Sequence, residues 1–293
     1  MPAVSREFRE FAPAKVNLTL HVLGRRADGY HEIESLVAFA DLGDRLTFIP
    51  GDRLTLDVSG PGAEASGAIG DNLILKAARE LAARFDRVLA GRFVLDKQLP
   101  VAAGLGGGSS DAAAALRLLA EHNGISADDP RLHAAARATG ADVPVCLDPK
   151  ARMMRGIGEI LSKPIALPEL PAVLVNPGVA VPTRDVFAAL AAPALTSPGQ
   201  PEDFITIDAD AASLVSVLAA RRNDLEIPAI KLQPIVADVL RTLQTSAGCL
   251  LARMSGSGAT CFALFGAVAA AQEVAQRLQA RHPGWWVRAA SLS

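Results

Sequence analysis

Hydrophobic and polar residues alternate strictly near the start of the chain. Between Lys15 and Val22 every second residue is apolar, and the residues between them are polar. This spacing predicts a half-buried strand, because successive side chains of a strand point to opposite faces. Lys15 and Asn17 are therefore expected to share one face, opposite the core. The turn-forming segment 24–29 should end the strand.

The same reading predicts strands and then helices in the first half, and a mixture of both in the second. We expect strands at 45–49, 54–58, 93–96, 172–176, 250–254, 260–265 and 286–292. Helices are expected after an N-cap at Asp71 and over 112–120, 131–138, 232–245 and 269–281. This pattern is typical of the α+β class.

Length and proline and glycine content indicate how the chain is divided. At 293 residues, two domains of roughly 100–200 residues each are expected. Proline and glycine become frequent after residue 164. We place an N-terminal domain at 1–160 and a C-terminal domain at 161–293.

Composition restricts the possible partners. Half of the residues are hydrophobic and the formal net charge is −2, so no basic surface is expected that would bind nucleic acid. No apolar stretch of 18 residues indicates a membrane span. The three cysteines lack the paired spacing of zinc or redox sites. We expect a cytoplasmic protein with a small-molecule substrate, acting as a monomer or a weak homodimer.

The segment PVAAGLGGGSS, residues 100–110, carries the strongest chemical signal. Glycines allow the backbone to approach a phosphate closely, and the amides at the start of the following helix attract the anion. A Walker A loop is excluded because the chain has no Gly-Lys pair, and the dinucleotide fingerprint fails because Ser109 stands at its third glycine. A flexible loop capped by Ser110 is the alternative. The candidate phosphate-binding residues are Pro100, Val101, Ala102, Ala103, Gly104, Leu105, Gly106, Gly107, Gly108, Ser109 and Ser110.

Two residues are candidates for the chemistry. Asp142 lies among small and apolar residues in a loop just after an expected helix end at Gly140, and such an acid can take a hydroxyl proton. Lys15 can lower the pKa of a substrate hydroxyl and pair with this acid. A turn aspartate and an exposed strand lysine are the alternatives.

Six segments carry a resemblance that covers nearly the whole chain. The ordered pattern of 100–110 resembles that of the galactokinase, homoserine kinase, mevalonate kinase and phosphomevalonate kinase superfamily. Together with segments 13–17, 26–31, 140–144, 155–160 and 255–258, it is similar to the 4-diphosphocytidyl-2-C-methyl-D-erythritol kinase family. The resemblance implies a two-domain small-molecule kinase fold. Its N-terminal, ATP-binding domain would be ribosomal protein S5 domain 2-like, and its C-terminal, substrate-side domain a ferredoxin-like α/β sandwich.

The resemblance also implies roles for individual residues. Lys15 and Asp142 would be the catalytic pair, and segment 100–110 would bind ATP, with Mg²⁺ carried by the nucleotide and no metal site in the protein. Tyr30 and His31 would hold the cytidine, for which a ring that stacks and a ring that hydrogen-bonds are suitable; a core tyrosine is the alternative. Asn17 and Thr183 would contact substrate. Segment 255–258 fits a hairpin turn and, by the resemblance, would lie beside the active site.

The expected activity is ATP-dependent phosphorylation of the 2-hydroxyl of 4-diphosphocytidyl-2-C-methyl-D-erythritol, in non-mevalonate isoprenoid precursor biosynthesis. A sister kinase acting on homoserine, mevalonate or a sugar is one alternative. A non-catalytic nucleotide- or RNA-binding module is another. Segment 101–103 departs from the family by carrying Val-Ala-Ala where relatives often have more glycine or a bulkier residue, which affects the expected fit of the nucleotide.

Overall fold

The chain forms two compact units that are interleaved along the sequence. A computed structural model describes residues 7–85, 90–195 and 210–293. Unit 1 comprises Met1–Ala14, Leu42–Val101 and Gly106–Pro149, and unit 2 comprises Lys15–Asp41, Ala102–Leu105 and Lys150–Ser293. Both units take part of strands β1 (Phe8–Asn17) and β3 (His31–Pro50). A sequential division at 160/161 stays a prediction.

The sheet of unit 1 contains β1, which pairs with β3, together with the second half of β3 and two further strands. β5 (Gly91–Asp96) runs antiparallel to β3, in register from Arg45 opposite Asp96 to Pro50 opposite Gly91. β4 (Thr55–Ser59) runs parallel to β5. The strands expected at 54–58 and 93–96 are confirmed to within two residues, whereas the one expected at 45–49 is the end of a 20-residue strand.

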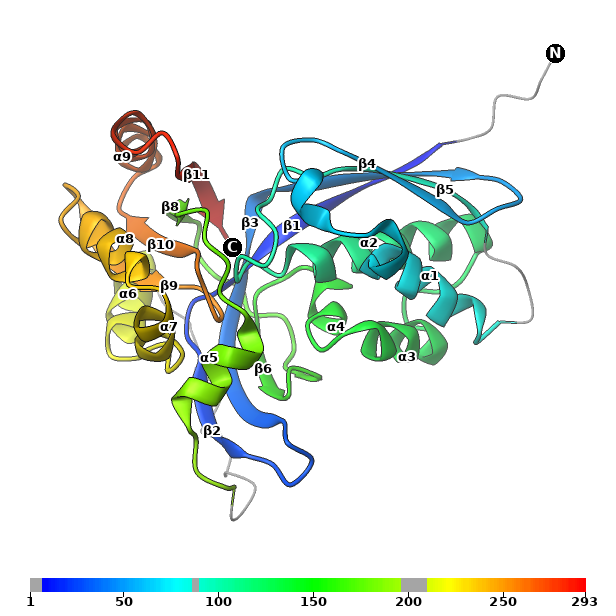
Figure 1. Ribbon diagram of the computed structural model, residues 1–293, viewed down its shortest axis with the longest axis horizontal. Coiled ribbons are helices and arrows are strands. Elements are labelled where there is room, and N and C mark those ends of the chain that lie inside the picture. The colour runs from blue at the N-terminus through cyan, green and yellow to red at the C-terminus, as the bar shows by residue number, and fades with distance from the viewer. Residues whose placement is uncertain (1–6, 86–89, 196–209) are drawn as a thin grey trace. The chain divides into compact units, whose positions relative to one another are not determined.

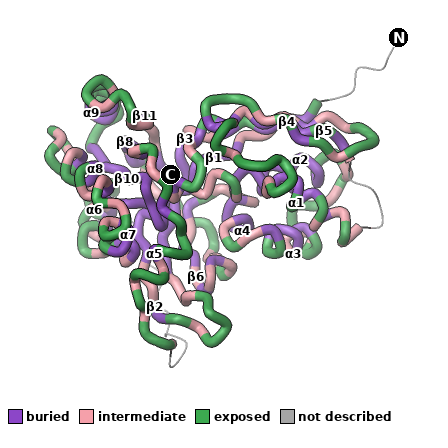
Figure 2. Tube along the Cα trace, in the orientation of Figure 1, coloured by how far each residue is buried: buried purple, intermediate pink, exposed green. Residues whose placement is uncertain are grey.

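Helices of unit 1 lie on one side of β4 and β5 (Figure 1). They are η1 (Glu64–Ser66), η2 (Ile69–Asp71), α1 (Leu73–Ala82), α2 (Gly107–Asn123), α3 (Pro130–Thr139) and α4 (Val143–Cys146). The cap expected at Asp71 is wrong by one residue: Asp71 closes the short helix η2, and the Asn72 side chain accepts the N–H of Ile74 instead. Alanines 112–115 of α2 are fully buried, and their small side chains let α1 pack against this helix (Figure 2).

Unit 2 contains the expected ferredoxin-like sandwich. Its strands are β8 (Leu170–Asn176), β9 (Cys249–Met254), β10 (Cys261–Phe265) and β11 (Trp286–Leu292). They are all antiparallel, in the spatial order β11-β8-β10-β9. Helices α8 (Ile235–Gln244) and α9 (Val268–Arg281) follow β8 and β10 along the chain and pack on these strands. This β-α-β-β-α-β order is that of the ferredoxin-like fold.

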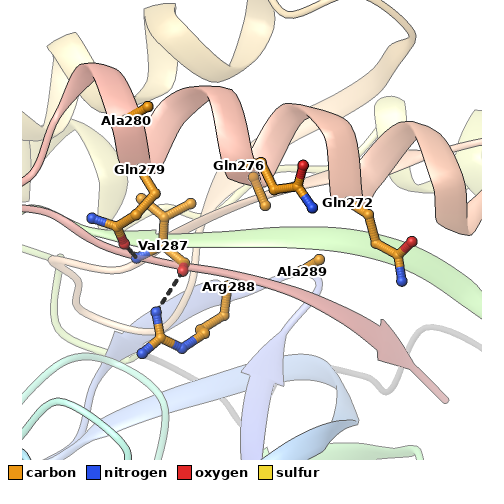
Figure 3. Close-up of a pocket in the computed structure, with 8 residues that line it drawn as sticks. Gln272, Gln276, Gln279, Ala280, Val287, Arg288 and Ala289 are labelled. Carbon is orange, nitrogen blue, oxygen red and sulfur yellow. Dashed lines mark hydrogen bonds between the residues drawn. The ribbon is translucent and has the colours of Figure 1, made fainter.

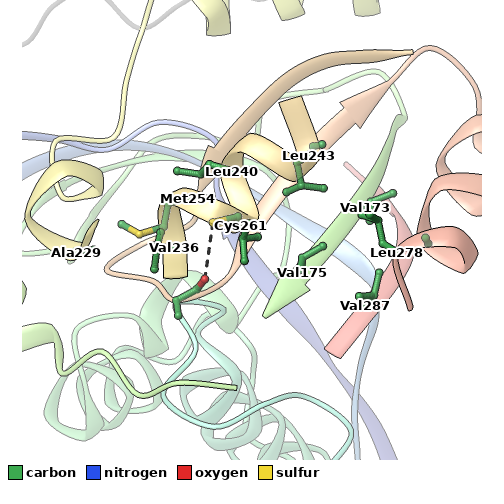
Figure 4. Close-up of a cluster of buried hydrophobic side chains, with 14 of the residues drawn as sticks. Val173, Val175, Ala229, Val236, Leu240, Leu243, Met254, Cys261, Leu278 and Val287 are labelled. Atoms are coloured by element: carbon green, nitrogen blue, oxygen red, sulfur yellow. Dashed lines mark hydrogen bonds between the residues drawn. The ribbon is translucent and has the colours of Figure 1, made fainter. Parts of the chain in front are cut away.

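A single hydrophobic cluster joins these helices to one face of the sandwich sheet (Figure 4). Val173 and Val175 point into it from β8, and Cys261 and Ala263 from β10, as expected when every second residue of a strand faces the same way. α8 and α9 contribute side chains at helical spacing, among them Leu243. The inward-facing residues of the strands and the apolar faces of the helices therefore form one shared core.

Unit 2 also contains elements outside the sandwich, two of which pair with the first half of β3. They are β2 (His21–Arg25), β6 (Arg152–Gly156), β7 (Ile160–Leu161), α5 (Thr183–Leu190), α6 (Ala211–Ala219) and α7 (Glu226–Leu232). β2 and β6 both pair antiparallel with β3. The strand expected over 15–22 is thus split, because β1 ends at Asn17 and β2 begins at His21. Within the described ranges, every helix is too short or too polar to cross a membrane.

Candidate functional site

Lys15 and Asn17 are brought together by strand β1. The Lys15 Nζ atom donates to Asn17 Oδ1 at 3.0 Å, which confirms that both side chains share a face. The expectation that this face lies opposite the core is wrong, since Lys15 is only 4% exposed and Asn17 only 2%. Polar partners in the fold make this burial possible: Asn17 Nδ2 donates to the hydroxyl of Ser35 in β3 at 2.7 Å.

The segment 255–258, hereafter the 255–258 turn, links the antiparallel strands β9 and β10, so the hairpin turn expected from the sequence is confirmed. Ser255 Oγ accepts the N–H of Asn17 at 3.0 Å and donates to the Gly104 carbonyl at 2.8 Å. Ser257 Oγ lies 2.8 Å from Thr183 Oγ1. Within unit 2 this turn therefore contacts β1, Thr183 and part of the glycine-rich segment.

The upstream half of the glycine-rich segment, residues 102–105, belongs to unit 2 and is held by backbone hydrogen bonds. Lys15 N–H donates to Leu105 O at 2.8 Å, and Thr260 N–H donates to Ala103 O at 3.1 Å. Gly104 has a φ of 75°, and a Cβ there would overlap the Ser255 carbonyl oxygen. Ala102 also has a positive φ, 51°. The alanine that departs from the family pattern thus occupies a left-handed conformation, which glycine adopts more easily.

The downstream half, residues 106–110, belongs to unit 1 and opens helix α2. The N-cap is Gly106, in a left-handed conformation, with no side chain capping the helix. The alternative of a loop capped by Ser110 is wrong, because Ser110 lies inside the first turns of the helix. Ser110 N–H donates to Gly106 O at 2.8 Å, while the amides of residues 107–109 precede the point where helical partners begin. Ser110 is fully buried, and its Oγ has no hydrogen-bond partner among the described residues.

A buried ionic cluster that sequence reasoning missed lies beneath this helix start. Lys97 Nζ is 2.6 Å from a carboxylate oxygen of both Asp44 and Asp111. Asp44 also accepts the N–H groups of Gln98 and Leu99 at 2.6 and 2.8 Å. A Cβ at Gly107 would lie 3.1 Å from the Lys97 ammonium. The cluster therefore supports the glycine-rich backbone from inside unit 1.

The cluster contains a carboxyl group with a strongly shifted pKa. Burial raises the pKa of Asp111 to about 7; the Lys97 charge opposes this and the Asp44 charge adds to it. Burial alone would lower the pKa of Lys97, but the two carboxylates raise it, so its ammonium stays charged. The geometry agrees with this shift, because Asp111 Oδ1 accepts no hydrogen bond among the described residues, whereas Asp44 accepts three.

Asp142 lies in unit 1, partly exposed, immediately before the short helix α4. As expected, it follows a helix end, because α3 stops at Thr139 and the N–H of Gly140 closes its last turn on Ala136. Pro144 lies in the first turn of α4, a position at which proline is tolerated. Lys15 and Asp142 belong to different units, so their catalytic pairing stays a prediction.

Tyr30 and His31 lie at the turn between β2 and β3. The Tyr30 residue is 59% exposed, which excludes the alternative of a core tyrosine. Its backbone is fixed, since Arg26 N–H donates to Tyr30 O at 2.7 Å and Tyr30 N–H donates to Asp28 at 3.0 Å. Burial, with a smaller contribution from the Arg25 charge, lowers the pKa of His31.

Phe187 is a second residue that the sequence reasoning missed. Its ring stacks on that of His31, with centroids 4.7 Å apart and planes 26° apart. Phe187 follows Thr183 by one turn of α5, and side chains at this spacing share a helix face. That spacing from Thr183 is the sequence signal that could have identified it.

No metal-binding cluster of three or more His, Cys, Asp or Glu residues occurs in the part of the chain that the structure describes. A separate pocket lies between α9 and β11 and is lined by Gln272, Gln276, Gln279 and residues 287–289 (Figure 3). None of the residues lining it was a site candidate.

Comparisons with known proteins identify the family. The chain matches the GHMP kinases N terminal domain over residues 72–148 and the GHMP kinases C terminal domain over residues 209–284. A 4-diphosphocytidyl-2-C-methyl-D-erythritol kinase from Methylorubrum extorquens is 57% identical, covering 96% of this chain and 98% of the relative.

Solved structures agree with this assignment. A crystal structure of 4-(cytidine 5'-diphospho)-2C-methyl-D-erythritol kinase matches with a TM-score of 0.76 and 37% identity, covering 98% of this chain and 99% of the other. A homoserine kinase from Cytophaga hutchinsonii, 18% identical, matches with a TM-score of 0.69 over 99% of this chain and 96% of its own, and shows the fold alone. The expected two-domain small-molecule kinase fold is confirmed, and the chain belongs to the 4-diphosphocytidyl-2-C-methyl-D-erythritol kinase family of GHMP kinases.

Proposed function

We propose that this protein transfers the γ-phosphoryl group of ATP to the 2-hydroxyl of 4-diphosphocytidyl-2-C-methyl-D-erythritol, in non-mevalonate isoprenoid precursor biosynthesis. The observation that carries the proposal is the match at 57% identity, over nearly the whole length of both chains, to a kinase named for this substrate. The proposal includes a cytoplasmic location and a monomer or weak homodimer.

Residues 106–110 are suited to hold the phosphates of ATP. The first-turn amides of α2 lack helical acceptors, and the positive end of the helix dipole favours an anion. The Ser110 hydroxyl has no partner among the described residues. It is enclosed by the protein, so it would bind a phosphate oxygen, or Mg²⁺ carried by the nucleotide, after a shift of the first turn of α2. ATP supplies the phosphoryl group, and the magnesium ion neutralises charge on its phosphates.

The chemistry is assigned to Asp142 and Lys15. The Asp142 carboxylate takes the proton of the 2-hydroxyl, while the bond from this oxygen to the γ-phosphorus forms and the bond to the bridging oxygen of ADP breaks. Lys15 stabilises the negative charge that develops. Asn17 supports this role, since it holds the ammonium at 3.0 Å and thereby limits the positions Lys15 can take.

The cytidine is assigned to Tyr30 and His31. An exposed ring on an ordered backbone can stack on a nucleobase. The lowered pKa of His31 keeps its imidazole neutral near pH 7, so that one ring nitrogen donates and the other accepts. Phe187 supports this assignment because its ring fixes the plane of the imidazole. Thr183 would contact substrate from the same face of α5.

ADP release, measured side by side with the cytidylated alcohol, mevalonate and homoserine, tests the substrate. We expect turnover with the cytidylated alcohol alone. Turnover of mevalonate or homoserine in its place would identify a sister kinase, and binding of nucleotide without any turnover would indicate a non-catalytic module.

The variant Asp142→Ala tests the assigned base. Loss of a general base lowers rates by about 10²–10⁴-fold, so kcat should fall by that factor while affinity for an ATP analogue is retained. Asp128→Ala, at an exposed position of the same unit, is the matched control. An undiminished kcat for Asp142→Ala would refute its role.

A further inference from the structure

Asn223 makes a set of buried hydrogen bonds that the proposed chemistry does not use. It lies just before α7 and is 5% exposed. Its Nδ2 donates to Met254 O at 2.8 Å and to Gly256 O at 2.7 Å, and its Oδ1 accepts the Leu225 N–H at 2.9 Å. Both amide protons are thus directed at the 255–258 turn and the residue that precedes it.

The segment around Asn223 is also attached to the chain that follows Asn17. Leu20 N–H donates to Arg222 O at 3.0 Å, and Asp224 N–H donates to Leu20 O at 2.8 Å. The Asp224 carboxylate accepts the Val22 N–H at 2.8 Å. These bonds fix the separation between β1 and the 255–258 turn, because one short segment is attached to both.

The turn has little room to move without displacing the predicted site residues of unit 2. A Cβ at Gly256 would lie 3.1 Å from Gly104 O and 3.3 Å from Asn17 Oδ1. Ser255 Oγ bonds to both Asn17 N and Gly104 O. Asn17 Oδ1 in turn accepts a hydrogen bond from the Lys15 ammonium group. A shift of the turn is therefore transmitted through direct contacts to the assigned catalytic lysine.

We propose that Asn223 is a positioning residue of the kinase: it holds the 255–258 turn in the place where Ser255 fixes Asn17 and the upstream half of the glycine-rich segment. This inference rests on the proposed function, since the residues that it positions are those assigned to substrate and phosphoryl transfer. Asn223 itself contacts neither the substrate nor the transferred phosphoryl group.

The proposal requires an amide at position 223. Two carbonyl oxygens need two donors, so the isosteric change Asn223→Asp places acceptors against acceptors, which leaves buried groups without partners. The other charged or titratable groups around the turn include Glu226, Arg253, Asp224 and His21. Glu226 accepts the Met254 N–H at 2.9 Å, and Arg253 donates to Leu18 O at 2.6 Å. The Asp224 carboxylate lies 3.8 Å from Nδ1 of His21. The new carboxyl group would become a donor to one carbonyl only when protonated.

The test compares Asn223→Asp and Asn223→Ala with wild type and with Leu278→Ala, which shortens a side chain of the same unit's hydrophobic cluster and is not part of the turn. All are assayed where circular dichroism shows them folded. We expect the two Asn223 variants to lose about 10- to 100-fold in kcat for the cytidylated alcohol, because a small displacement of positioned groups can cost about 10²-fold in rate, and Leu278→Ala less than threefold. Amide hydrogen exchange should become faster over 254–260 in both Asn223 variants only.

The pH dependence separates positioning from general destabilisation. Burial beside two carbonyl oxygens raises the pKa of the new carboxyl group above its ordinary value. As the pH is lowered, the kcat of Asn223→Asp relative to wild type should therefore rise, whereas the ratio for Asn223→Ala should stay constant. Wild-type kcat in both variants, or unchanged exchange over 254–260, would overturn the inference. If wild type does not turn over the cytidylated alcohol, the proposed function fails, and the exchange experiment alone decides whether Asn223 holds the turn.

Discussion

Residues 104–110 of the glycine-rich segment and the 255–258 turn both consist mainly of glycine and serine, but their polar groups differ in hydrogen bonding. The 255–258 turn is fixed by side-chain hydrogen bonds, from Asn223 outside the turn and from its own Ser255 hydroxyl. Residues 106–110 instead run into a 17-residue helix, with amides and the Ser110 hydroxyl left available. Similar residues therefore form a structural turn where their polar groups are satisfied and a candidate anion site where they are not.

The largest effect that would test this contrast is expected for Gly104→Ala. The Cβ of an alanine at this position would overlap the Ser255 carbonyl oxygen, and the alanine would have to adopt the left-handed backbone conformation of Gly104. We expect the free energy of unfolding to fall by about 2–5 kcal/mol, from the left-handed strain and the overpacking together. Urea denaturation measures it. Gly108→Ala, whose Cβ would meet only Leu73 at 3.5 Å, is the matched control in the downstream half, and an equal loss there would contradict the contrast.

Two serine substitutions compare a satisfied hydroxyl with an available one. Ser255→Ala leaves Asn17 N and Gly104 O without their partner, which should lower the free energy of unfolding by about 1–3 kcal/mol. Ser110→Ala removes a buried hydroxyl that has no partner among the described residues, so the free energy of unfolding should not fall while the KM for ATP rises. The reverse ranking in thermal or urea unfolding would show that the two hydroxyls were assigned the wrong way round.

Titration should distinguish the two segments as well, because only the downstream half rests on an ionic cluster. The pKa of Asp111 is raised from 3.8 to about 7 in the folded protein, so this group contributes stability below about pH 4 that is lost as the pH rises through 7. Asp111→Asn removes this titration. The stability of wild type relative to the variant should therefore decrease by an amount on the order of 1 kcal/mol between pH 5 and pH 7, and a constant difference would be inconsistent with a raised pKa.

The smallest effect is expected at Ala102, in the upstream half. Its left-handed φ of 51° costs an alanine about 1–2 kcal/mol, and the greater freedom of glycine in the unfolded chain offsets about 0.5–1 kcal/mol of the relief. Ala102→Gly should thus raise the melting temperature slightly. A lower melting temperature would mean that the alanine side chain contributes packing that outweighs the strain.

Elements with a clear period were predictable from the sequence. β11 occupies 286–292 as expected, and α9 begins within one residue of the expected position. The shared face of Lys15 and Asn17 followed from alternation, but their burial did not, because it depends on Ser35 and other polar groups elsewhere in the chain. The periodicity of hydrophobic residues indicates which residues share a face of a strand or helix. It does not indicate which other parts of the chain cover that face.

The missed features share a different cause. The contacts of Lys97 with Asp44 span 53 positions, and those of Asn223 with Met254 span 31. Such pairs leave no local spacing in a single sequence. α6 and α7 were also missed, since their positions depend on packing against the sandwich. The glycine-rich segment could be recognised because all of its residues are adjacent in the sequence.

The pairing of β11 with β3 joins segments that are far apart in the sequence, and this has a consequence for synthesis. Ser293 and Phe39 exchange backbone hydrogen bonds of 2.9 and 3.0 Å, and Leu292 pairs with Ala40. On the ribosome, β3 must therefore wait for this partner until β11 has been synthesised and has left the exit tunnel. The strand that carries His31 and Ser35 can be completed only after residues 286–292 have emerged, so a nascent chain stalled before β11 should leave unit 2 unfinished.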